Sequence, residues 1–329
     1  MSGPSAPDRD TMRAALDVAC RAPSLHNTQP WRWRLDGHSL HLHADPARML
    51  PATDPAGRQM VISCGAALQH AAVAFAALGW HTVIHRLPDR SDPDHLARVE
   101  FEQQDFIRAR DVALATSAVR RRTDRRPFLP CALPDPVPHQ LVTAAYRERG
   151  ELLILPPELA SDLLVSSRLA DLEHENDEDY RTELAGWTGT QAGPDGVPAT
   201  ALLTPLATRL VQVARDFHRG ELTPTEHTPD GATLTVLCTP SDDRADWLRV
   251  GEALSAVLLE ATGAGLASCA VTHPTEIAES RAVLERALLS LGVGSRHAQV
   301  VVRIGQVAGP LVGPRSPRRP LGEIAHGWR

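Results

Sequence analysis

Five arginines stand close together near the middle of the chain. They are Arg120, Arg121, Arg122, Arg125 and Arg126, with Thr123 among them. Guanidinium groups at this spacing repel one another unless an anion pairs with them, and a phosphate accepts charge-assisted hydrogen bonds from both arginine and threonine. The pattern therefore favours a phosphate site, although a solvated basic helix end pairing with nearby acids fits it equally well.

A second basic pair, Arg318-Arg319, lies near the C-terminus. It could complete the same phosphate site from a distant part of the chain. A disordered basic tail explains the pair equally well.

A polar loop near the N-terminus offers a different chemistry. Residues 24–29 read Ser-Leu-His-Asn-Thr-Gln and are followed by Pro30-Trp31. Short hydrogen-bonding side chains and backbone amides can recognise a flat heterocycle that carries alternating donors and acceptors. A plain turn between a helix and a strand is the alternative. No GxGxxG or GxxxxGK[ST] motif is present, which argues against a Rossmann dinucleotide site or a P-loop.

Two further chemistries have weaker support. His38, His41 and His43 could line a metal site, but alternation along a half-exposed strand explains them as well. Cys64 follows Ser63, yet no histidine and acid at matching positions support a nucleophile, so packing is the simpler role. We therefore assign no metal ligand and no catalytic side chain.

Composition limits the class of protein. The chain has 329 residues, 43% of them hydrophobic, and a net charge of -6, which argues against nucleic acid as a partner. Five cysteines without a Cys-x-x-Cys spacing, together with an N-terminus that lacks a signal-peptide core, favour a soluble cytoplasmic protein. The most apolar run, 61–80, contains Gln69 and His70, so we expect a buried helix and no membrane span.

An internal repeat suggests how the site is positioned. Gly65-Ala66-Ala67-Leu68 and Gly251-Glu252-Ala253-Leu254 each begin an apolar helix that ends fourteen residues later, at Gly79 and Gly265. Coincidence is the alternative. We expect an α+β fold with a first half at 1–110, a second half at 111–329 and a lid-like insertion at about 157–229.

The expected elements follow from periodicity. Helices are expected over 11–21, 59–79, 111–121, 139–148 and 251–265. Strands are expected over 31–35, 39–43, 82–84, 151–155, 233–237, 268–271 and 299–304. Residues 91–110 are expected to connect the halves.

The motifs together resemble the nitroreductase-fold flavoproteins, and among them the Acg-type, internally duplicated FMN-binding proteins. The segments that carry the resemblance are Ala22-Pro23-Ser24-x-x-Asn27-Thr28-Gln29-Pro30-Trp31, Asp54-Pro55-x-x-Arg58, Ser63 to Leu68, Arg121-Arg122-Thr123-x-Arg125, Glu183-Leu184-x-x-Trp187, Asp195-Gly196-Val197-Pro198, Gly263 to Cys269 and Arg319-Pro320-Leu321.

The resemblance implies a sandwich that is normally built by two interlocked subunits, with FMN at each side of their interface. Here the first half has the polar loop but no arginine turn, and the second half has the arginine turn but no such loop. One complete pocket should remain. The resemblance therefore implies one FMN per chain, in a pseudo-dimer that is a monomer or a weak homodimer.

The resemblance also assigns the cofactor-binding residues. Arg121, Arg122, Thr123, Arg125, Arg318 and Arg319 would surround the phosphate. Ser24, Leu25, Asn27 and Gln29 would meet the ring and the ribityl chain from the other half. Thr272 and His273 fall where the family presents a backbone N–H to the flavin N5.

Two functions follow from the resemblance. The first is an FMN-dependent oxidoreductase that passes hydride from NAD(P)H through flavin N5 to a nitro compound, a quinone or another conjugated acceptor. The second is an FMN-sequestering protein in which the lid covers the flavin and NAD(P)H turnover is slight. The long insertion favours the second, and the resemblance to reductases favours the first.

Overall fold

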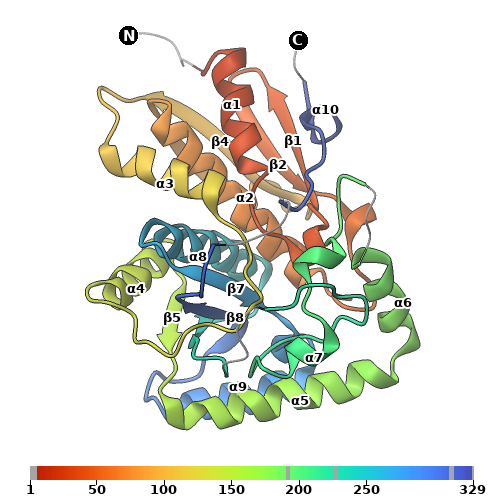
Figure 1. The fold of residues 1–329 in the computed structure, drawn as a ribbon. Coiled ribbons are helices and arrows are strands. Elements are labelled where there is room, and N and C mark those ends of the chain that lie inside the picture. Colours follow the sequence, from red (N-terminus) through yellow and green to blue (C-terminus); the bar gives the residue numbers. More distant parts are fainter. Residues whose placement is uncertain (1–5, 190–192, 225–228, 311–314, 328–329) are drawn as a thin grey trace.

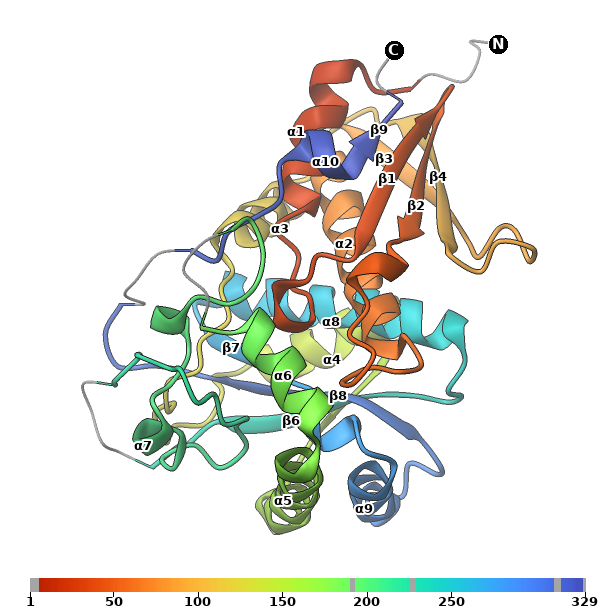
Figure 2. The ribbon, with the colours of Figure 1, turned by 90° about the vertical axis from the view of Figure 1, so that its right-hand side faces the viewer.

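Two mainly antiparallel sheets lie on either side of a central pair of helices in the computed structural model (Figures 1 and 2). The structure describes residues 6–189, 193–224, 229–310 and 315–327. The chain first builds the sheet nearer both termini and then the second sheet. Its C-terminal segment finally returns to the first sheet.

The first sheet has the strand order β3-β4-β2-β1-β9. Its strands are β1 (Trp31–Asp36), β2 (Ser39–Ala44), β3 (Trp80–Arg86), β4 (His95–Gln103) and β9 (Ala325–His326). Helices α1 (Arg9–Ala19) and α2 (Arg58–Ala77) pack on one face, where Trp31 and Trp33 are fully buried. The short β9 pairs parallel with β1, so the end of the chain completes this sheet.

The second sheet has the strand order β5-β6-β8-β7. Its strands are β5 (Glu151–Ile154), β6 (Thr233–Thr239), β7 (Ala267–Val271) and β8 (His297–Gly305). Helices α4 (Val137–Arg147) and α8 (Arg244–Gly263) cover one face, while α5 (Ala160–Asn176) and α9 (Ala278–Leu289) cover the other (Figure 2).

The remaining elements connect these layers. The longer of them are α3 (Ala109–Arg120), which contacts both central helices, and α6 (Glu178–Trp187) in the insertion. The short helices are α7 (Pro205–Thr208) and α10 (Leu321–Ile324). The 3-10 turns are η1 (Leu25–Asn27), η2 (Pro46–Arg48), η3 (Pro157–Leu159), η4 (Ala199–Ala201) and η5 (His273–Thr275).

Both halves follow the same path through their sheets. The sequence β1-β2-α2-β3-β4 has its counterpart in β5-β6-α8-β7-β8, and in each half the second strand pairs with the fourth. The insertion interrupts the second half between β5 and β6. This shared topology is consistent with the repeat expected from the sequence.

The two helices of the repeat cross at their glycines. Gly65 and Gly251 are each the eighth residue of a 20-residue helix, α2 and α8. A Cβ atom at Gly65 would lie 2.1 Å from the Leu248 carbonyl oxygen, and one at Gly251 would lie 2.1 Å from the Ile62 carbonyl oxygen. Only hydrogen at both positions allows this close approach of the backbones. The repeated glycine therefore marks the contact between the halves.

Most of the expected elements are present, and the predicted α+β class is confirmed. Helix α9 and the two-residue β9 were missed, and so was β4, which occupies nine of the twenty residues expected to connect the halves. The alternation in β4 is interrupted where Leu96 and Ala97 are both buried, next to an irregular register between β2 and β4. The alternation of buried and exposed residues that identifies a strand therefore extends over only a few residues of β4.

Helix α2 has the length and apolar character of a membrane span, but 78% of its most apolar window is buried inside the protein. It contacts α1, α3 and α8. Burial among other helices explains its composition, as expected from the sequence.

Candidate functional site

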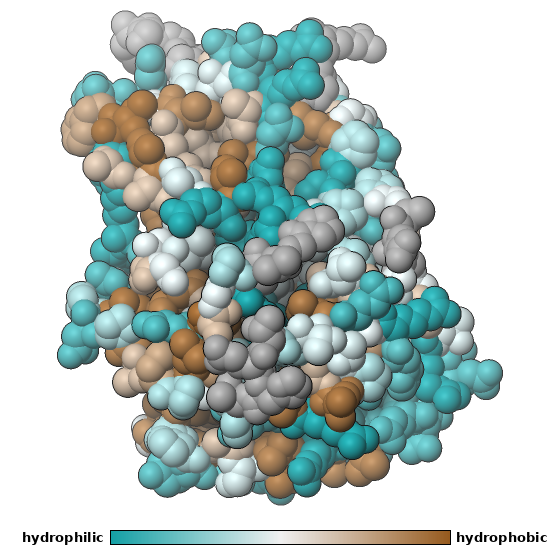
Figure 3. Space-filling view, viewed as in Figure 1, coloured by the Kyte–Doolittle hydropathy of each residue, from teal (hydrophilic) through white to brown (hydrophobic). Residues whose placement is uncertain are grey.

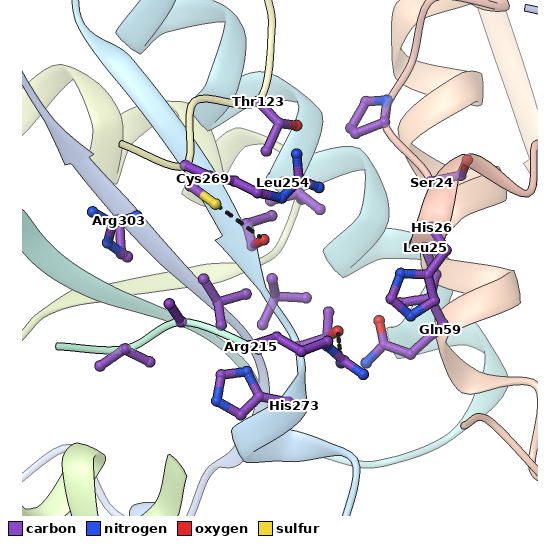
Figure 4. A pocket seen from close by; sticks show the side chains of 18 of the residues that line it. Ser24, Leu25, His26, Gln59, Thr123, Arg215, Leu254, Cys269, His273 and Arg303 are labelled. Carbon is purple, nitrogen blue, oxygen red and sulfur yellow. Dashed lines mark hydrogen bonds between the residues drawn. The ribbon is translucent and has the colours of Figure 1, made fainter. Parts of the chain in front are cut away.

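Two adjoining pockets lie between the halves. The inner pocket reaches the second sheet at β7 and β8, and the outer pocket extends past the arginine turn to the C-terminal segment. The residues that line both are Pro23, Ser24, His26, Thr123 and Arg125. Figure 4 shows Ser24, Leu25, His26 and Gln59 of the first half on one side of the inner pocket, and residues of the second half on the other. The polar loop and the arginine turn thus meet, as the sequence predicted.

The polar loop has an unusual backbone that its own contacts hold in place. His26, Asn27 and Gln29 have φ angles of 44°, 59° and 50°, a backbone region that residues other than glycine rarely adopt. The Leu25 N–H donates to Ser63 Oγ at 3.2 Å, and the Gln29 N–H donates to Ser24 Oγ at 3.0 Å. Such conformations cost about 1–3 kcal/mol each and cluster at ligand sites. The loop is therefore preformed, with Ser24 and Leu25 on the pocket wall.

The two amide side chains of the loop have separate roles. The Asn27 Nδ2 group donates to the carbonyl oxygens of Gly196 and Pro317 at 2.9 and 3.0 Å, and Asn27 lines the outer pocket only. The Gln29 Nε2 group donates to the Pro194 carbonyl at 2.9 Å, and Gln29 lines neither pocket. Asn27 therefore lies at the pocket while tying down its neighbours. The structure does not bring Gln29 to either pocket, because its side chain points toward the insertion and the C-terminal segment.

The arginine turn is anchored to the second sheet. Arg121 ends α3, and the Asp124 N–H donates to the Ser268 carbonyl of β7 at 2.9 Å. Asp124 also accepts hydrogen bonds from Arg126, the closest at 2.7 Å. One of the clustered arginines is therefore neutralised within the turn. Arg122, Thr123 and Arg125 line the outer pocket, and Thr123 and Arg125 line the inner one too.

Arg121 is a buried cation without a carboxylate partner among the described residues. It is 8% exposed and its Nε atom has no partner, while its Nη2 atom donates a long hydrogen bond, at 3.5 Å, to the Arg21 carbonyl. Burial and the nearby positive charge of Arg318 lower the pKa of Arg121 to about 9. A buried charge is expensive unless it is paired. The outer pocket is therefore suited to an anion.

The two C-terminal arginines differ in position. The Arg318 guanidinium lines the outer pocket and donates to the Cys20 carbonyl at 2.9 Å and to Asn27 Oδ1 at 3.0 Å. Arg319 lines neither pocket, and its closest acids are Glu323 and Asp45, at 3.7 and 3.9 Å. Arg318 is thus placed where the phosphate assignment requires it. The structure does not bring Arg319 to either pocket, because its side chain lies behind the loop, against the Gln29 carbonyl.

The far end of the inner pocket is formed by Thr272 and His273, which follow β7. The His273 ring is fully buried, and its Nε2 lies 2.6 Å from Ser167 Oγ. Burial and the positive charge of Arg215 lower the pKa of His273 well below its usual value, so the ring is neutral. Apolar side chains make up much of the remaining wall, including Leu254, Val271, Val300 and Phe217.

Buried polar atoms without partners gather around these pockets. They are His26 Nε2, Gln59 Nε2, Arg121 Nε and His273 Nδ1. Buried polar groups in folded proteins are nearly always hydrogen-bonded, so four orphans at one place indicate a missing ligand with polar edges. The sequence analysis missed His26 and Gln59. His26 lay inside the polar loop, and Gln59 directly follows the Asp54 to Arg58 motif.

Part of the insertion forms a roof over both pockets. We call residues 193–224 the roof. Its pocket-lining residues are Val197, Thr200, Ala201, Leu203, Val213, Ala214, Arg215, Phe217 and Leu222. By contrast, α5 contributes to neither pocket among its described residues and packs against α9. Only part of the predicted lid therefore covers the site.

The roof is attached to both halves by ion pairs. Arg48, from the first half, pairs with Asp195. Arg215 donates to Glu276 at 2.5 Å, and Glu276 also accepts a hydrogen bond from Thr272 at 2.6 Å. Glu276 raises the pKa of Arg215 although burial opposes it. The buried Arg215–Glu276 pair and the partly exposed Arg48–Asp195 pair hold the roof over the pockets, and the sequence analysis missed Arg215.

The histidines of β2 do not lie at the pockets. His41 Nδ1 lies 2.9 Å from His95 Nε2, and His43 stacks on the same ring at 4.5 Å. Within the described residues, no group of three or more histidine, cysteine or acidic side chains could hold a metal ion.

Comparisons with known proteins identify relatives along nearly the whole chain. No family model matches it. The Mycobacterium tuberculosis protein named "Putative NAD(P)H nitroreductase acg" is 37% identical over 325 residues, which cover 96% of both chains. "Putative NAD(P)H nitroreductase Rv3131" of the same organism is 39% identical over 326 residues, 97% of this chain and 92% of the relative.

Solved structures give remote likenesses. The FMN-dependent nitroreductase NfnB from Mycobacterium smegmatis, solved with NADPH, is 17% identical with a TM-score of 0.39 and aligns with 66% of this chain and 100% of its own. At this TM-score the likeness establishes nothing about the ligands of this chain. The two mycobacterial relatives, similar over almost their full lengths, confirm the resemblance seen in the sequence, and this chain belongs to the Acg-type nitroreductase family.

Proposed function

We propose that the chain binds one FMN in the joined pockets and acts as an FMN-dependent NAD(P)H oxidoreductase. The phosphate would lie in the outer pocket and the ring in the inner pocket. Nitro compounds, quinones and other conjugated molecules are the proposed acceptors. The relatives are named as NAD(P)H nitroreductases, which supports this reaction class.

The unpaired Arg121 supports the proposal most strongly. A buried guanidinium with an orphaned Nε requires an anionic partner, and the Thr123 and Arg125 side chains line the same pocket. Together they can donate several charge-assisted hydrogen bonds to a phosphate. Ser24 and Asn27 complete the wall from the other half.

The side chains that line the inner pocket match the apolar faces and the polar edge of an isoalloxazine ring. Leu254 and Val300 offer apolar surface for the ring system, and Gln59 Nε2 and His26 Nε2 offer unpaired polar atoms to a polar edge. A bound flavin supplies the hydride chemistry, so no side-chain nucleophile is needed. The protein's part is to orient the ring, exclude water and present Thr272 and His273 at the end of the pocket.

We infer that one chain replaces the usual pair of subunits. The proposed halves are 1–110 and 111–329, with β9 returning to the first sheet. Because both sides of the pockets come from one chain, a second copy is not needed, and a monomer or weak homodimer is proposed. All five cysteines are free thiols, which supports the proposed cytoplasmic location.

The closed roof favours a second candidate function. Arg215 and Asp195 hold the roof through ion pairs to Glu276 and Arg48. A roof fixed in this way would keep NAD(P)H from stacking on the ring, and the protein would then store FMN with little turnover.

Flavin retention tests the binding proposal. The double variant Arg121→Ala/Arg125→Ala should lose FMN while its circular dichroism stays unchanged. Hydrogen bonds to charged groups contribute about 1.5–3 kcal/mol each, so a loss of at least about 100-fold in affinity is expected. Arg209→Ala, an exposed arginine outside both pockets, is the matched control. Unchanged flavin content in the double variant would refute the phosphate assignment.

Anaerobic reduction separates the two functions. For the oxidoreductase, NADPH or NADH should bleach the yellow FMN-loaded protein within seconds to minutes. Bleaching by dithionite but by neither nicotinamide would support storage and exclude the reductase. A colourless protein that takes up no FMN would exclude both.

A further inference from the structure

The outer pocket carries more positive charge than one phosphate balances. Its lining includes six arginines: Arg21, Arg121, Arg122, Arg125, Arg315 and Arg318. Asp124 is the one carboxylate among the described lining residues, and its oxygens already accept hydrogen bonds from Arg126. A phosphate monoester carries a charge of about -1.5 to -2 at pH 7. Leaving Arg122 aside, the other five arginines form no ion pair with a carboxylate of the described residues, so a single bound phosphate would not balance their charge.

The arginines occupy two parts of the pocket. Arg125 also lines the inner pocket, so it lies toward the proposed ring, together with Thr123. Arg21 and Arg315 line the outer pocket alone, as do three others, but Arg315 is exposed and Arg21 is half-buried, whereas Arg121 is buried. Figure 3 shows hydrophilic side chains on this face, between α3 and the C-terminal segment. The charge thus extends from a buried end to an exposed mouth.

Arg21 and Arg315, the arginines at the mouth of the outer pocket, lie close enough to Arg318 to affect its pKa. Burial is the main cause that lowers the pKa of Arg318 to about 10; Cys20 opposes the shift, and the positive charges of Arg21 and Arg315 add to it. The Arg318 guanidinium is held by carbonyl oxygens, such as that of Cys20 at 2.9 Å, which bring no net charge. The Arg315 guanidinium likewise donates to a carbonyl, that of Val119, at 2.6 Å. Carbonyl oxygens are neutral, so they do not cancel the repulsion between these guanidinium groups. An anion bound at the mouth would reduce that repulsion, as one bound at Arg121 would.

We propose that Arg21 and Arg315 form a second phosphate subsite at the mouth of the outer pocket, beside the subsite for the FMN phosphate. This inference rests on the proposed function. The second phosphate group belongs either to a flavin dinucleotide or to a phosphorylated nicotinamide dinucleotide. Both ligands would present an additional phosphate group to Arg21 and Arg315.

Calorimetry at low ionic strength distinguishes these sources. Cofactor-free protein is titrated with FMN and FAD, and FMN-loaded protein is titrated with NADP⁺ and NAD⁺. In at least one pair the ligand with the additional phosphate should bind about tenfold tighter. A preference for FAD assigns the subsite to the flavin, and a preference for NADP⁺ assigns it to the electron donor.

Variants test the residues. Arg21→Ala/Arg315→Ala should remove the tenfold preference and leave FMN affinity within about twofold. The single variant Arg315→Glu reverses the charge of an exposed side chain. It should weaken binding of the preferred ligand more than the double alanine variant does, without disturbing the fold. The control Arg181→Ala/Arg219→Ala removes the same charge from exposed arginines outside both pockets and should keep the preference.

Three results would overturn the subsite. Equal affinity within both ligand pairs would do so and leave FMN binding intact, so the proposed function would stand. Loss of the preference in the control would mean that total charge, and not the mouth, attracts the ligand. Failure of FMN itself to bind would refute the proposed function and the subsite together.

Discussion

The two halves share a topology but end their third strands differently. After β7, Thr272 and His273 line the inner pocket. At the last residue of the equivalent β3, the Arg86 guanidinium donates two hydrogen bonds to Glu252 of α8, both at 2.7 Å, and Glu252 is fully buried. Burial raises the pKa of Glu252 to about 7, although Arg86 opposes the shift. One strand end is open to a ligand, and an ion pair closes the other.

The connections before the first strands differ in the same sense. Residues 20–30 separate α1 from β1 and form the polar loop, whereas only residues 148–150 separate α4 from β5. A tight turn has no room for a ligand-binding loop. The comparison indicates that a duplicated fold can keep one site by retaining a long loop in one half, and close the other with side chains.

Placing side chains between the halves should have the largest effect. In Gly65→Ala the new Cβ would meet the Leu248 carbonyl oxygen at 2.1 Å, so the central helices must separate. Overpacking of this kind costs about 3 kcal/mol. Chemical denaturation measures the loss. Gly186→Ala, in a helix where nothing lies within 4 Å, should leave stability unchanged or slightly higher, and equal losses in both variants would contradict the crossing.

Breaking the Arg86–Glu252 ion pair at the end of β3 should lower the stability of the protein but leave flavin binding unchanged. Arg86→Ala leaves the Glu252 carboxyl buried without its partner and should cost about 2 kcal/mol. Its FMN content should equal that of the parent protein, because the pair lies away from both pockets. Replacing both residues, as Arg86→Met/Glu252→Leu, should restore most of the stability. Loss of FMN in Arg86→Ala with the fold intact would show that the two ends are not separate.

The contact between the central helices should be sensitive to acid. Burial lowers the pKa of His70 to about 3, and its Nδ1 lies 2.7 Å from Ser255 Oγ of α8. The unfolded histidine binds a proton below about pH 6.5 and the folded one does not, so stability is complete above that pH and is lost as pH falls. The loss should be about 1.4 kcal/mol per pH unit, down to about pH 3.

The variant His70→Asn isolates this effect. The pH slope of its unfolding free energy between pH 6 and 4 should be smaller than in the parent protein. His38→Asn, at an exposed site, should keep the parent slope. Identical slopes in all three proteins would exclude His70 as the cause.

Loosening the roof should give the smallest effect. Glu276→Gln removes the carboxylate that Arg215 and Thr272 share, so FMN should dissociate about tenfold faster. Fluorescence of released FMN measures the rate. Glu173→Gln, on the exposed side of α5, is the control. An unchanged rate in Glu276→Gln would mean that the roof does not limit exchange.

The sequence predicted features that depend on local patterns. The arginine turn, the polar loop and the paired glycines are each short motifs, and the structure brings all three to the boundary between the halves. Helices such as α2 and α8 follow from apolar runs of helical length. Their type and order required no knowledge of distant contacts.

The rest depends on how distant segments meet. Gln29 and Arg319 have residue types suited to a ligand site, but the backbone at Gln29, with φ 50°, directs both toward each other behind the loop. His26 and Gln59 became candidates only when their burial and missing partners were visible, and Arg215 only when its ion pair with Glu276 was visible. The Arg86–Glu252 pair joins residues 166 positions apart, and no sequence spacing predicts it.

The central claim is that the two half-sites form one flavin site in each chain. The direct measurement is the ratio of FMN to polypeptide after saturation and removal of free flavin, from absorbance and amino-acid analysis. We expect a ratio of one in the parent protein and in Arg86→Ala, and close to zero in Arg121→Ala/Arg125→Ala. A ratio of two, or a flavin content that does not depend on Arg121 and Arg125, would contradict it.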